Sequence, residues 1–320
     1  MLIRVLSQRL IGLFGFFVLA SIVIFLVVDV LPGDPATLML GTDARPDTLN
    51  ALRHQLGLDK PLIIQYFSWA SGLVRLDFGT SMTYATPVLT LIAERLPISL
   101  PLAAFSLILT ALIAIPFGAL AGLKKDAATD RIIRTGMQIS LAIPNIWLAI
   151  VLVLIFAVSL HWLPAGGFPG WGAGVWPAVR SLLLPMVALA VPQAAILARI
   201  VRAEVIDKSQ ENFVLGARAR GLSDQAILLR HILPNAMLPV LSVMGLQCAF
   251  LIAGTVIVET GFSLPGLGRL IFQAINQRDM PVVKGVAMLL VGSVILINSV
   301  VDLAATLIDP RLRRRGEALP

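Results

Sequence analysis

The sequence predicts an all-α, polytopic membrane protein, and three observations support this fold class. Hydrophobic residues make up 58% of the 320-residue chain and charged residues only 13%, whereas about a quarter of the residues in an average soluble domain are charged. The mean hydropathy is +0.90. Six apolar stretches approach the length of roughly 20 residues that a helix needs to cross a bilayer. The composition therefore excludes a soluble fold.

The six predicted membrane helices follow these apolar stretches in chain order. They are Leu10–Val30, Ile98–Leu123, Thr135–Leu160, Leu182–Val201, Met237–Val258 and Val283–Leu307. The first stretch is too long for the core of a signal peptide, and no small-residue cleavage pattern follows it, so we expect it to be retained. An even number of spans places both termini on the same side of the membrane.

Basic residues predict the orientation, because the cytoplasmic flanks of membrane helices are enriched in Lys and Arg. They gather on the side that holds the termini, in residues 124–134, 199–230 and 311–315. The short opposite loops hold Arg180, Arg269 and Arg278, with Lys284 at a helix edge. Both termini are therefore predicted to be cytoplasmic. Topology and anionic headgroups account for the net charge of +7, and without a recognisable module we expect no nucleic-acid partner.

Three segments follow from this topology. Residues 1–97 hold the first helix and a long external loop, residues 98–308 form a five-helix core, and residues 309–320 are a basic cytoplasmic tail. Within the external loop, Pro46 opens a helical pattern that Gly57 closes, and residues 61–76 form an amphipathic run. We favour packing on neighbouring helices as the role of this loop, with docking of a soluble partner as the alternative.

A polar cytoplasmic segment, residues 204–236, interrupts the apolar core. Its first helix is predicted over Glu211–Arg220, where Gly216, Ala217 and Ala219 permit close approach of another surface. Gly221 ends that helix, since glycine accepts a positive φ. Ser223 is a favourable N-cap for a second helix with Asp224 in its first turn, and Pro234 is expected to end it.

Functional groups are scarce elsewhere. There is no phosphate-binding loop of the GxxxxGK[ST] type, so the chain is not expected to be an enzyme or to bind ATP. The histidines lie in loops and form no ligand pattern, so neither a metal site nor a catalytic residue is predicted. Some polar residues inside the spans should face the bundle, a partner or a hydrated path, either as helix–helix contacts or as pathway contacts. They are Gln138, Asn145, Gln193, Gln247 and Asn298.

The polar segment resembles the EAA signature of permease subunits in binding-protein-dependent ATP-binding-cassette importers. Ala217, Gly221, Leu233 and Pro234 fit this signature, whereas Leu215, Gly216 and His231 depart from it. The run Ala217–Leu222, ARARGL, is similar to the ARAKGL form of dipeptide and oligopeptide importers. Further stretches that resemble the same subgroup are Leu31–Pro35, Leu56–Asp59, Phe78–Ser81, Glu259–Thr260, Pro265–Gly268 and Asp309–Leu312.

This resemblance implies a type I importer permease fold with a long first periplasmic loop, of the first-permease type in the dipeptide, oligopeptide and nickel class. It implies a bacterial inner-membrane location, a second permease subunit and an external substrate-binding protein. Two ATPase subunits would bind ATP and Mg. The loop 204–236 would contact an ATPase subunit and transmit its closure. The residues assigned to this contact are Phe213, Gly216, Ala217, Arg218, Ala219, Arg220, Gly221, Leu222, Leu233 and Pro234.

Other functions remain open at this point. An importer of the same class could carry a nickel chelate, glutathione or a sugar. An ion-driven secondary transporter would usually show repeated halves and buried ionisable groups at mid-membrane, and the spans are almost free of such charges. An intramembrane hydrolase would need a nucleophile and base or metal ligands at membrane depth, and no such pattern is present. Dependence of transport on a partner ATPase distinguishes the importer from both of these rivals.

Overall fold

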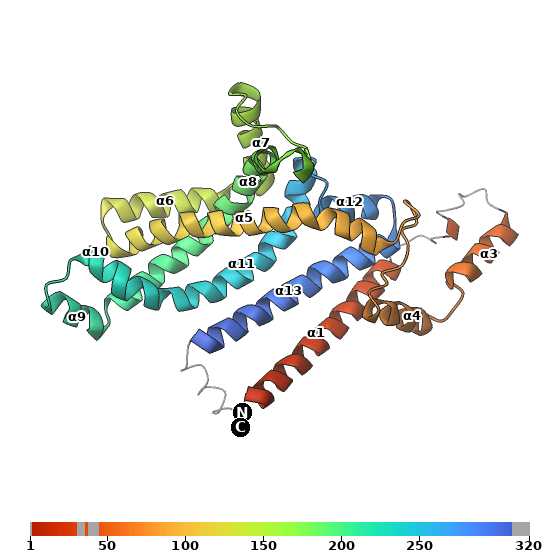
Figure 1. Cartoon of the computed structure of the whole chain (residues 1–320), viewed down its shortest axis with the longest axis horizontal. Helices are drawn as coiled ribbons and strands as arrows, with labels where there is room; N and C mark the ends of the chain where they lie inside the picture. Colours follow the sequence, from red (N-terminus) through yellow and green to blue (C-terminus); the bar gives the residue numbers. More distant parts are fainter. Residues whose placement is uncertain (1, 31–35, 38–44, 309–320) are drawn as a thin grey trace. The chain divides into compact units, whose positions relative to one another are not determined.

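The computed structural model describes residues 2–30, 36–37 and 45–308. The regular secondary structure in this part of the chain is helical, apart from one isolated bridge between Thr80 and Pro87 (Figure 1). The predicted all-α fold class is confirmed. The stretch Leu31–Pro35, which resembles the importer subgroup, and the predicted basic tail 309–320 lie outside the described residues. The chain divides into two compact units, residues 1–99 with 265–295 and residues 100–264 with 296–320.

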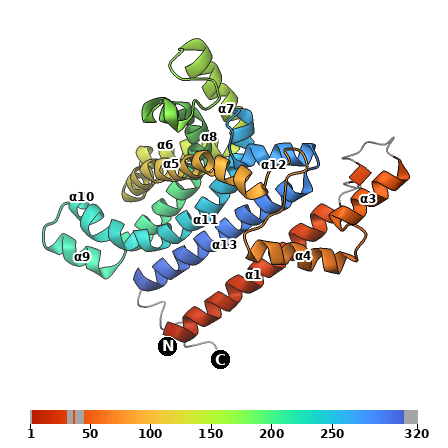
Figure 2. The ribbon, with the colours of Figure 1, turned by 45° about the vertical axis from the view of Figure 1, so that its right-hand side comes forward.

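The first unit is built from four helices and parts of two longer ones. They are α1 (Leu2–Val30), α3 (Pro46–Leu56), α4 (Leu62–Val74), α12 (Leu267–Asn276), the start of α5 (Val88–Leu123) and the start of α13 (Met280–Ile308). As predicted, Pro46 is the first residue of α3, and Gly57 follows its last residue with φ +69°. Helix α4 lies beside α1 (Figure 2). The Ser21 and Tyr66 hydroxyls form a 2.9 Å hydrogen bond between these two helices.

A buried carboxylate fixes one loop of the first unit. Asp279 directly precedes α13 and is completely buried. The Ser81 hydroxyl donates to its Oδ2 at 2.5 Å, and the backbone N–H groups of Met82 and Thr83 donate at 3.2 and 3.1 Å. Three donors from one loop therefore converge on a single side chain, which compensates for removing its charge from water.

The second unit contains the remaining helices. They are the rest of α5, α6 (Ala128–Ala142), α7 (Asn145–Leu152), the π-helical turn Val153–Ser159, the 3₁₀ turn Trp171–Ala173, α8 (Val175–Ser209), α9 (Asn212–Ala219), α10 (Asp224–Ile227), the π-helical turn Leu228–Ile232, α11 (Leu233–Gly261) and the end of α13. Helix α8 is central, because α6, α7 and α11 all pack against it. It continues through two internal prolines, Pro185 and Pro192.

Helices α5 and α8 approach each other at the level of their backbones. A Cβ on Gly118 would lie 2.5 Å from the carbonyl oxygen of Ala198, and one on Gly122 would lie 2.8 Å from Val205. Only glycine therefore fits at these two positions without moving the helices apart. The close contact supports the apolar core formed by α5, α6, α8 and α11.

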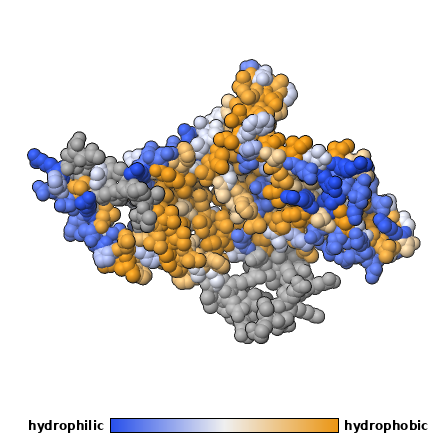
Figure 3. Space-filling model, turned by 180° about the vertical axis from the view of Figure 1, so that it is seen from behind, coloured by the Kyte–Doolittle hydropathy of each residue, from blue (hydrophilic) through white to orange (hydrophobic). Residues whose placement is uncertain are grey.

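Four described helices are long and apolar enough to cross a membrane, and five if one bent pair counts as a span. The four are Val88–Leu123, Val175–Ser209, Asp224–Gly261 and Met280–Val301. Within α1, residues Gly12–Val28 form a further apolar stretch. Figure 3 shows broad apolar areas on the surface, as expected for helices in contact with lipid. Two helices begin earlier than the predicted spans. Helix α5 begins at Val88, before the predicted Ile98, and α8 begins at Val175, before the predicted Leu182.

The predicted span over Thr135–Leu160 is divided into two helices in the structure. Helices α6 and α7 meet at an angle of 100°. Ile143 has an extended backbone, with φ −87° and ψ 120°. This is the conformation favoured for a residue before proline, and Pro144 follows it. A single proline thus converts the predicted span into a bent pair, whereas Pro192 leaves α8 continuous.

Candidate functional site

The polar segment forms a helix–turn–helix at the end of α8, where α9 and α10 lie together (Figure 1). Helix α8 ends at Ser209, and Glu211 resumes with an extended backbone before α9. The Lys208 ammonium lies 2.6 Å from a Glu211 carboxylate oxygen and 3.5 Å from Asp207. These exposed ion pairs bridge the corner between α8 and α9, where each contributes at most about 1 kcal/mol.

Helix α9 has a buried face and an exposed face. Val214 and Ala217 are completely buried in an apolar cluster that also contains Val201, Val205 and Ile227. Because Val214 and Ala217 are three residues apart, they lie on one side of the helix. The opposite side is open to solvent and includes a leucine with 58% exposure. The exposed residues are Leu215, Gly216, Arg218, Ala219 and Arg220.

The turn after α9 follows the sequence prediction. Gly221 has φ +77°, and its N–H donates to the Arg218 carbonyl at 2.9 Å. Ser223 caps α10, since its hydroxyl accepts the Ala226 N–H at 3.4 Å. Asp224 follows in the first turn and lies 3.6 Å from the Arg218 guanidinium. The helix break at Gly221 and the N-cap at Ser223 are confirmed.

We expect Gly221→Ala to loosen this turn, because a left-handed conformation costs a residue with a Cβ roughly 1–2 kcal/mol. No other atom lies within 4 Å of the added Cβ, so the cost is conformational and not steric. Hydrogen–deuterium exchange over residues 212–227 should accelerate by about tenfold for each 1.4 kcal/mol by which the substitution lowers the free energy of local unfolding.

Gly216→Ala is the matched control for this substitution. Gly216 lies within α9, and a Cβ added there would also have no atom within 4 Å. Alanine is favoured over glycine in a helix by about 1 kcal/mol. Exchange in α9 should therefore slow or stay unchanged in this variant. Equal acceleration in both variants would contradict a specific role for the backbone of Gly221.

The expectation that the second helix ends near Pro234 is wrong. Helix α10 continues through the π-helical turn Leu228–Ile232 directly into α11. Pro234 lies in the first turn of α11, where a missing N–H is tolerated. In a regular α-helix, the N–H of residue 234 would have to donate a hydrogen bond, and proline has no N–H. The π-helical turn directly before Pro234 has a different hydrogen-bond spacing, which accommodates the proline. Residues 224–261 therefore form one continuous membrane-length element.

The ten residues predicted for partner contact divide into three groups by burial. Ala217 is buried, Phe213, Leu222 and Leu233 are half-buried against the apolar cluster, and the others are exposed, namely Gly216, Arg218, Ala219, Arg220, Gly221 and Pro234. Sequence reasoning missed Val214, which anchors the segment together with Ile227 and Ile232. The spacing of Val214 and Ala217 was the available signal for the buried face of α9.

The structure brings together two of the five polar residues predicted inside the spans. The Gln247 side-chain nitrogen donates to the Gln193 backbone carbonyl at 2.9 Å, which links α11 to α8. Within the described part of the chain, neither of their side-chain oxygens has a hydrogen-bond partner. Gln138 is exposed on α6, and Asn145 and Asn298 are half-buried on other helices. A pathway role for these residues remains a prediction.

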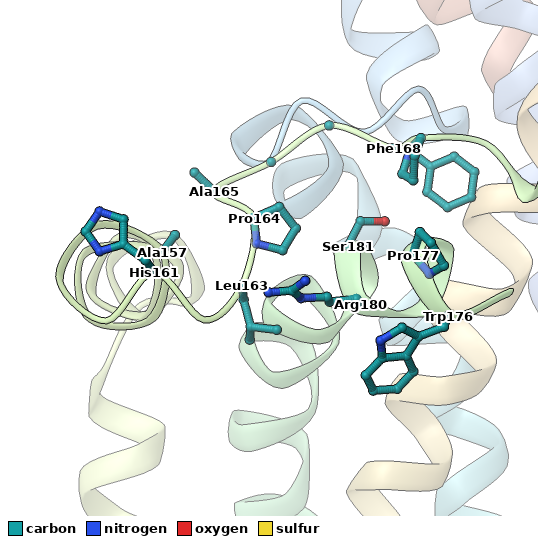
Figure 4. Close-up of a pocket in the computed structure, with 13 residues that line it drawn as sticks. Ala157, His161, Leu163, Pro164, Ala165, Phe168, Trp176, Pro177, Arg180 and Ser181 are labelled. Carbon is teal, nitrogen blue, oxygen red and sulfur yellow. The ribbon is translucent and has the colours of Figure 1, made fainter. Parts of the chain in front are cut away.

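A cavity of about 790 Å³ lies at the other end of α8 from α9 (Figure 4). Its walls come from the end of the π-helical turn after α7, the loop 163–169 and the first turns of α8. The Arg180 guanidinium donates to the Trp162 carbonyl. The loop is attached to α11, since the Gly167 N–H donates to the Phe262 carbonyl at 2.8 Å. Among the described residues, no group of acidic, His and Cys side chains is arranged to bind a metal.

The family match, together with the membrane-length helices, defines an inner-membrane transport component. Residues 114–314 match the family described as "Binding-protein-dependent transport system inner membrane component". Residues 1–103 match its N-terminal companion, "Binding-prot-dependent transport system membrane comp, N-term". The chain belongs to this family.

Named relatives match over nearly their whole lengths. The chain is 38% identical over 306 residues to a "Probable peptide ABC transporter permease protein y4tP" of Sinorhizobium fredii, which covers 96% of this chain and 98% of the relative. It is 38% identical to a "Putative peptide transport system permease protein" of Brucella abortus, over 92% of this chain and 94% of the relative. It is 37% identical to the "Glutathione transport system permease protein GsiC" of Escherichia coli, over 96% and 97%.

A solved structure supports the same fold. The inward-facing MetNI methionine ABC transporter matches 69% of this chain and 97% of its own chain, with a TM-score of 0.56 and 19% identity. This likeness concerns the fold alone. As a member of its family, the chain is a multi-pass inner-membrane permease of a binding-protein-dependent ABC importer. It is a transport subunit without an ATPase domain, and such importers bind ATP on partner ATPases.

Proposed function

We propose that this chain is the pore-forming subunit of an importer for dipeptides or oligopeptides. Its support is the 38% identity, over nearly full length, to permeases named for peptide transport. The relative named for glutathione transport, at 37%, makes that tripeptide the alternative substrate. Nickel chelates and sugars remain substrates of the wider class implied by the sequence. Family membership excludes the two alternative functions, an ion-driven secondary transporter and an intramembrane hydrolase.

The proposed complex contains this chain, a second permease, two ATP-binding subunits and an external binding protein. In it, α1 is a sixth membrane span in addition to the four long helices and the bent α6–α7 pair. The apolar residues Gly12–Val28 support this assignment. Six spans place both termini in the cytoplasm, together with α9 and α10, as the distribution of basic residues predicts.

We assign residues 211–234, the coupling segment, to contact with an ATPase subunit. One observation carries this assignment: the buried face of α9 belongs to the apolar cluster shared with α8, α10 and α11, while its other face, with Leu215 and Ala219, is presented to solvent. The segment is thus fixed on the permease side and open on the other. An exposed apolar side chain among small and basic residues is suited to a protein contact.

Crosslinking in membranes tests this contact. Cys248 is replaced by Ala, which removes the chain's single cysteine, and a new cysteine at Ala219 is paired with cysteines in a surface cleft of the candidate ATPase. We expect a crosslink whose yield changes between the nucleotide-free and ATP-bound states. Val175→Cys is the control, because this exposed residue lies at the opposite end of α8 and should give no crosslink.

Absence of the Ala219→Cys crosslink in an intact complex would remove the coupling assignment and leave the family membership unaffected. Uptake by proteoliposomes that contain the whole complex and its binding protein tests the substrate. We expect ATP-dependent uptake of a labelled dipeptide or oligopeptide, reduced by excess unlabelled peptide. Uptake of glutathione with no effect of other peptides would replace the peptide assignment by its alternative.

A further inference from the structure

A buried ion pair joins α6 to α8 near the coupling segment. Arg202 of α8 donates from Nε to Oδ1 of Asp130 and from Nη2 to its Oδ2, each at 2.7 Å. The Asp130 side chain is 0% exposed and that of Arg202 is 18% exposed. This parallel, two-bond arrangement fixes the direction of both side chains as well as their distance.

Asp130 also organises the connection that leads into α6. The Asp126 N–H donates to Asp130 Oδ2 at 3.0 Å, and Asp126 has a positive φ of 64°. One carboxylate therefore holds the turn before α6, the first turn of α6 and the guanidinium on α8. The end of α5 belongs to the same assembly, because Gly122 packs directly against Val205 of α8.

The position of Arg202 relates this ion pair to the coupling segment. Arg202 lies between Val201 and Val205, both completely buried in the cluster that also holds Val214 and Ala217 of α9. Helix α9 packs on α10 and on the π-helical turn 228–232, and this turn packs on α8. A displacement of α9 therefore reaches α8 through this shared cluster. Arg202 lies in the same helical turn of α8 as the two valines, and its hydrogen bonds to Asp130 join this turn of α8 to α6.

We propose that Asp130 and Arg202 are positioning residues for energy coupling, which lock α6 to α8 so that α9, the end of α8 and α6 move as one body. This proposal rests on the proposed function of the coupling segment. A buried pair suits the task, since its two parallel hydrogen bonds allow one relative position of the helices. Removing one partner leaves an uncompensated buried charge. The rigid body extends along α6 to its end at Ala142, where the 100° bend begins.

The first experiment measures coupling in the reconstituted complex, with the second permease, the ATPase subunits and the binding protein present. In Asp130→Asn and Arg202→Lys, we expect substrate molecules transported per ATP hydrolysed to fall by about fivefold or more, the lower end of allosteric coupling. ATP hydrolysis should continue at a rate close to that of the unchanged complex. A general folding defect would instead lower both quantities in parallel, at an unchanged ratio.

The control is the exposed ion pair between Lys208 and Glu211, which is also charged and closer to α9. Lys208→Gln should leave the transported-per-ATP ratio nearly unchanged, because exposed pairs contribute little. An unchanged ratio in Asp130→Asn would overturn the proposal, as would an equal fall in Lys208→Gln. If the Ala219→Cys crosslink forms while Asp130→Asn stays coupled, the positioning role fails and the coupling segment stands.

A second measurement leaves the ion pair intact and does not depend on the folding of a variant. Spin labels are placed at Arg131 and Ala219, which are exposed on α6 and α9, with Cys248 replaced. We expect one narrow distance distribution that is the same in the nucleotide-free and ATP-bound complex. A shift in this distance between the two states would show that α9 and α6 move separately and would overturn the proposal.

Discussion

Gly118→Ala is expected to prevent most of the chain from reaching a stable fold. The added Cβ would lie 2.5 Å from the Ala198 carbonyl oxygen and 2.7 Å from the Val201 Cβ, both on α8. Neither atom is the end of a flexible side chain, so the two helices must separate. Overpacking of a tight core costs about 1–3 kcal/mol, and we expect a cost near the upper end here.

The measurement is the thermal unfolding midpoint of the purified protein in detergent, together with the fraction that elutes as a single species. Gly136→Ala is the matched control on α6, because no atom lies within 4 Å of its added Cβ. Alanine should stabilise that helix by up to about 1 kcal/mol. If the midpoints of the two variants are the same, the close approach of α5 and α8 does not limit stability.

Asp279→Ala should have the second large effect. It removes the acceptor of one hydroxyl and two backbone N–H groups in the loop after Gly79. Each buried donor left without a partner costs about 1–3 kcal/mol, so we expect a total of about 3 kcal/mol after partial relaxation. The loop should become accessible to limited proteolysis at residues 80–87 before the chain unfolds globally.

Two further variants make this result specific. Asp279→Asn retains one side-chain oxygen as an acceptor. The resistance of its loop to proteolysis should therefore lie between that of the alanine variant and that of the unchanged chain. Asp77→Ala is the control on the same loop, since Asp77 is exposed and accepts a single bond from the Gly79 N–H at 2.9 Å. Protease resistance in Asp279→Ala would contradict the role of this carboxylate in fixing the loop.

Local signals in the sequence predict local structure well. Pro46 and Gly57 mark the ends of α3, and Gly221 and Ser223 mark the turn between α9 and α10. In each case, the conformational limits of one residue act on the backbone within a few positions. The apolar stretches also predict membrane helices, because hydrocarbon imposes a length and a composition.

Features that depend on distant contacts are not predictable in this way. Asp130 and Arg202 are 72 residues apart. In the sequence Arg202 is one of many basic residues that indicate only the cytoplasmic side, and no pattern relates Asp130 to it. Pro234 predicts a helix end, since a proline has this effect in a regular α-helix. The preceding π-helical turn, which accommodates it, has no recognised signal in a single sequence.

The continuity of α10 with α11 has a geometric consequence for the proposed coupling. Residues 224–261 comprise 38 residues, which at 1.5 Å per residue gives a rod of about 57 Å. A tilt of about 10° at one end moves the other by about 10 Å over this length. A small rotation imposed on the coupling segment is thus amplified to about the diameter of a helix on the far side of the membrane. The proposed coupling therefore requires only a small movement of the ATPase subunit.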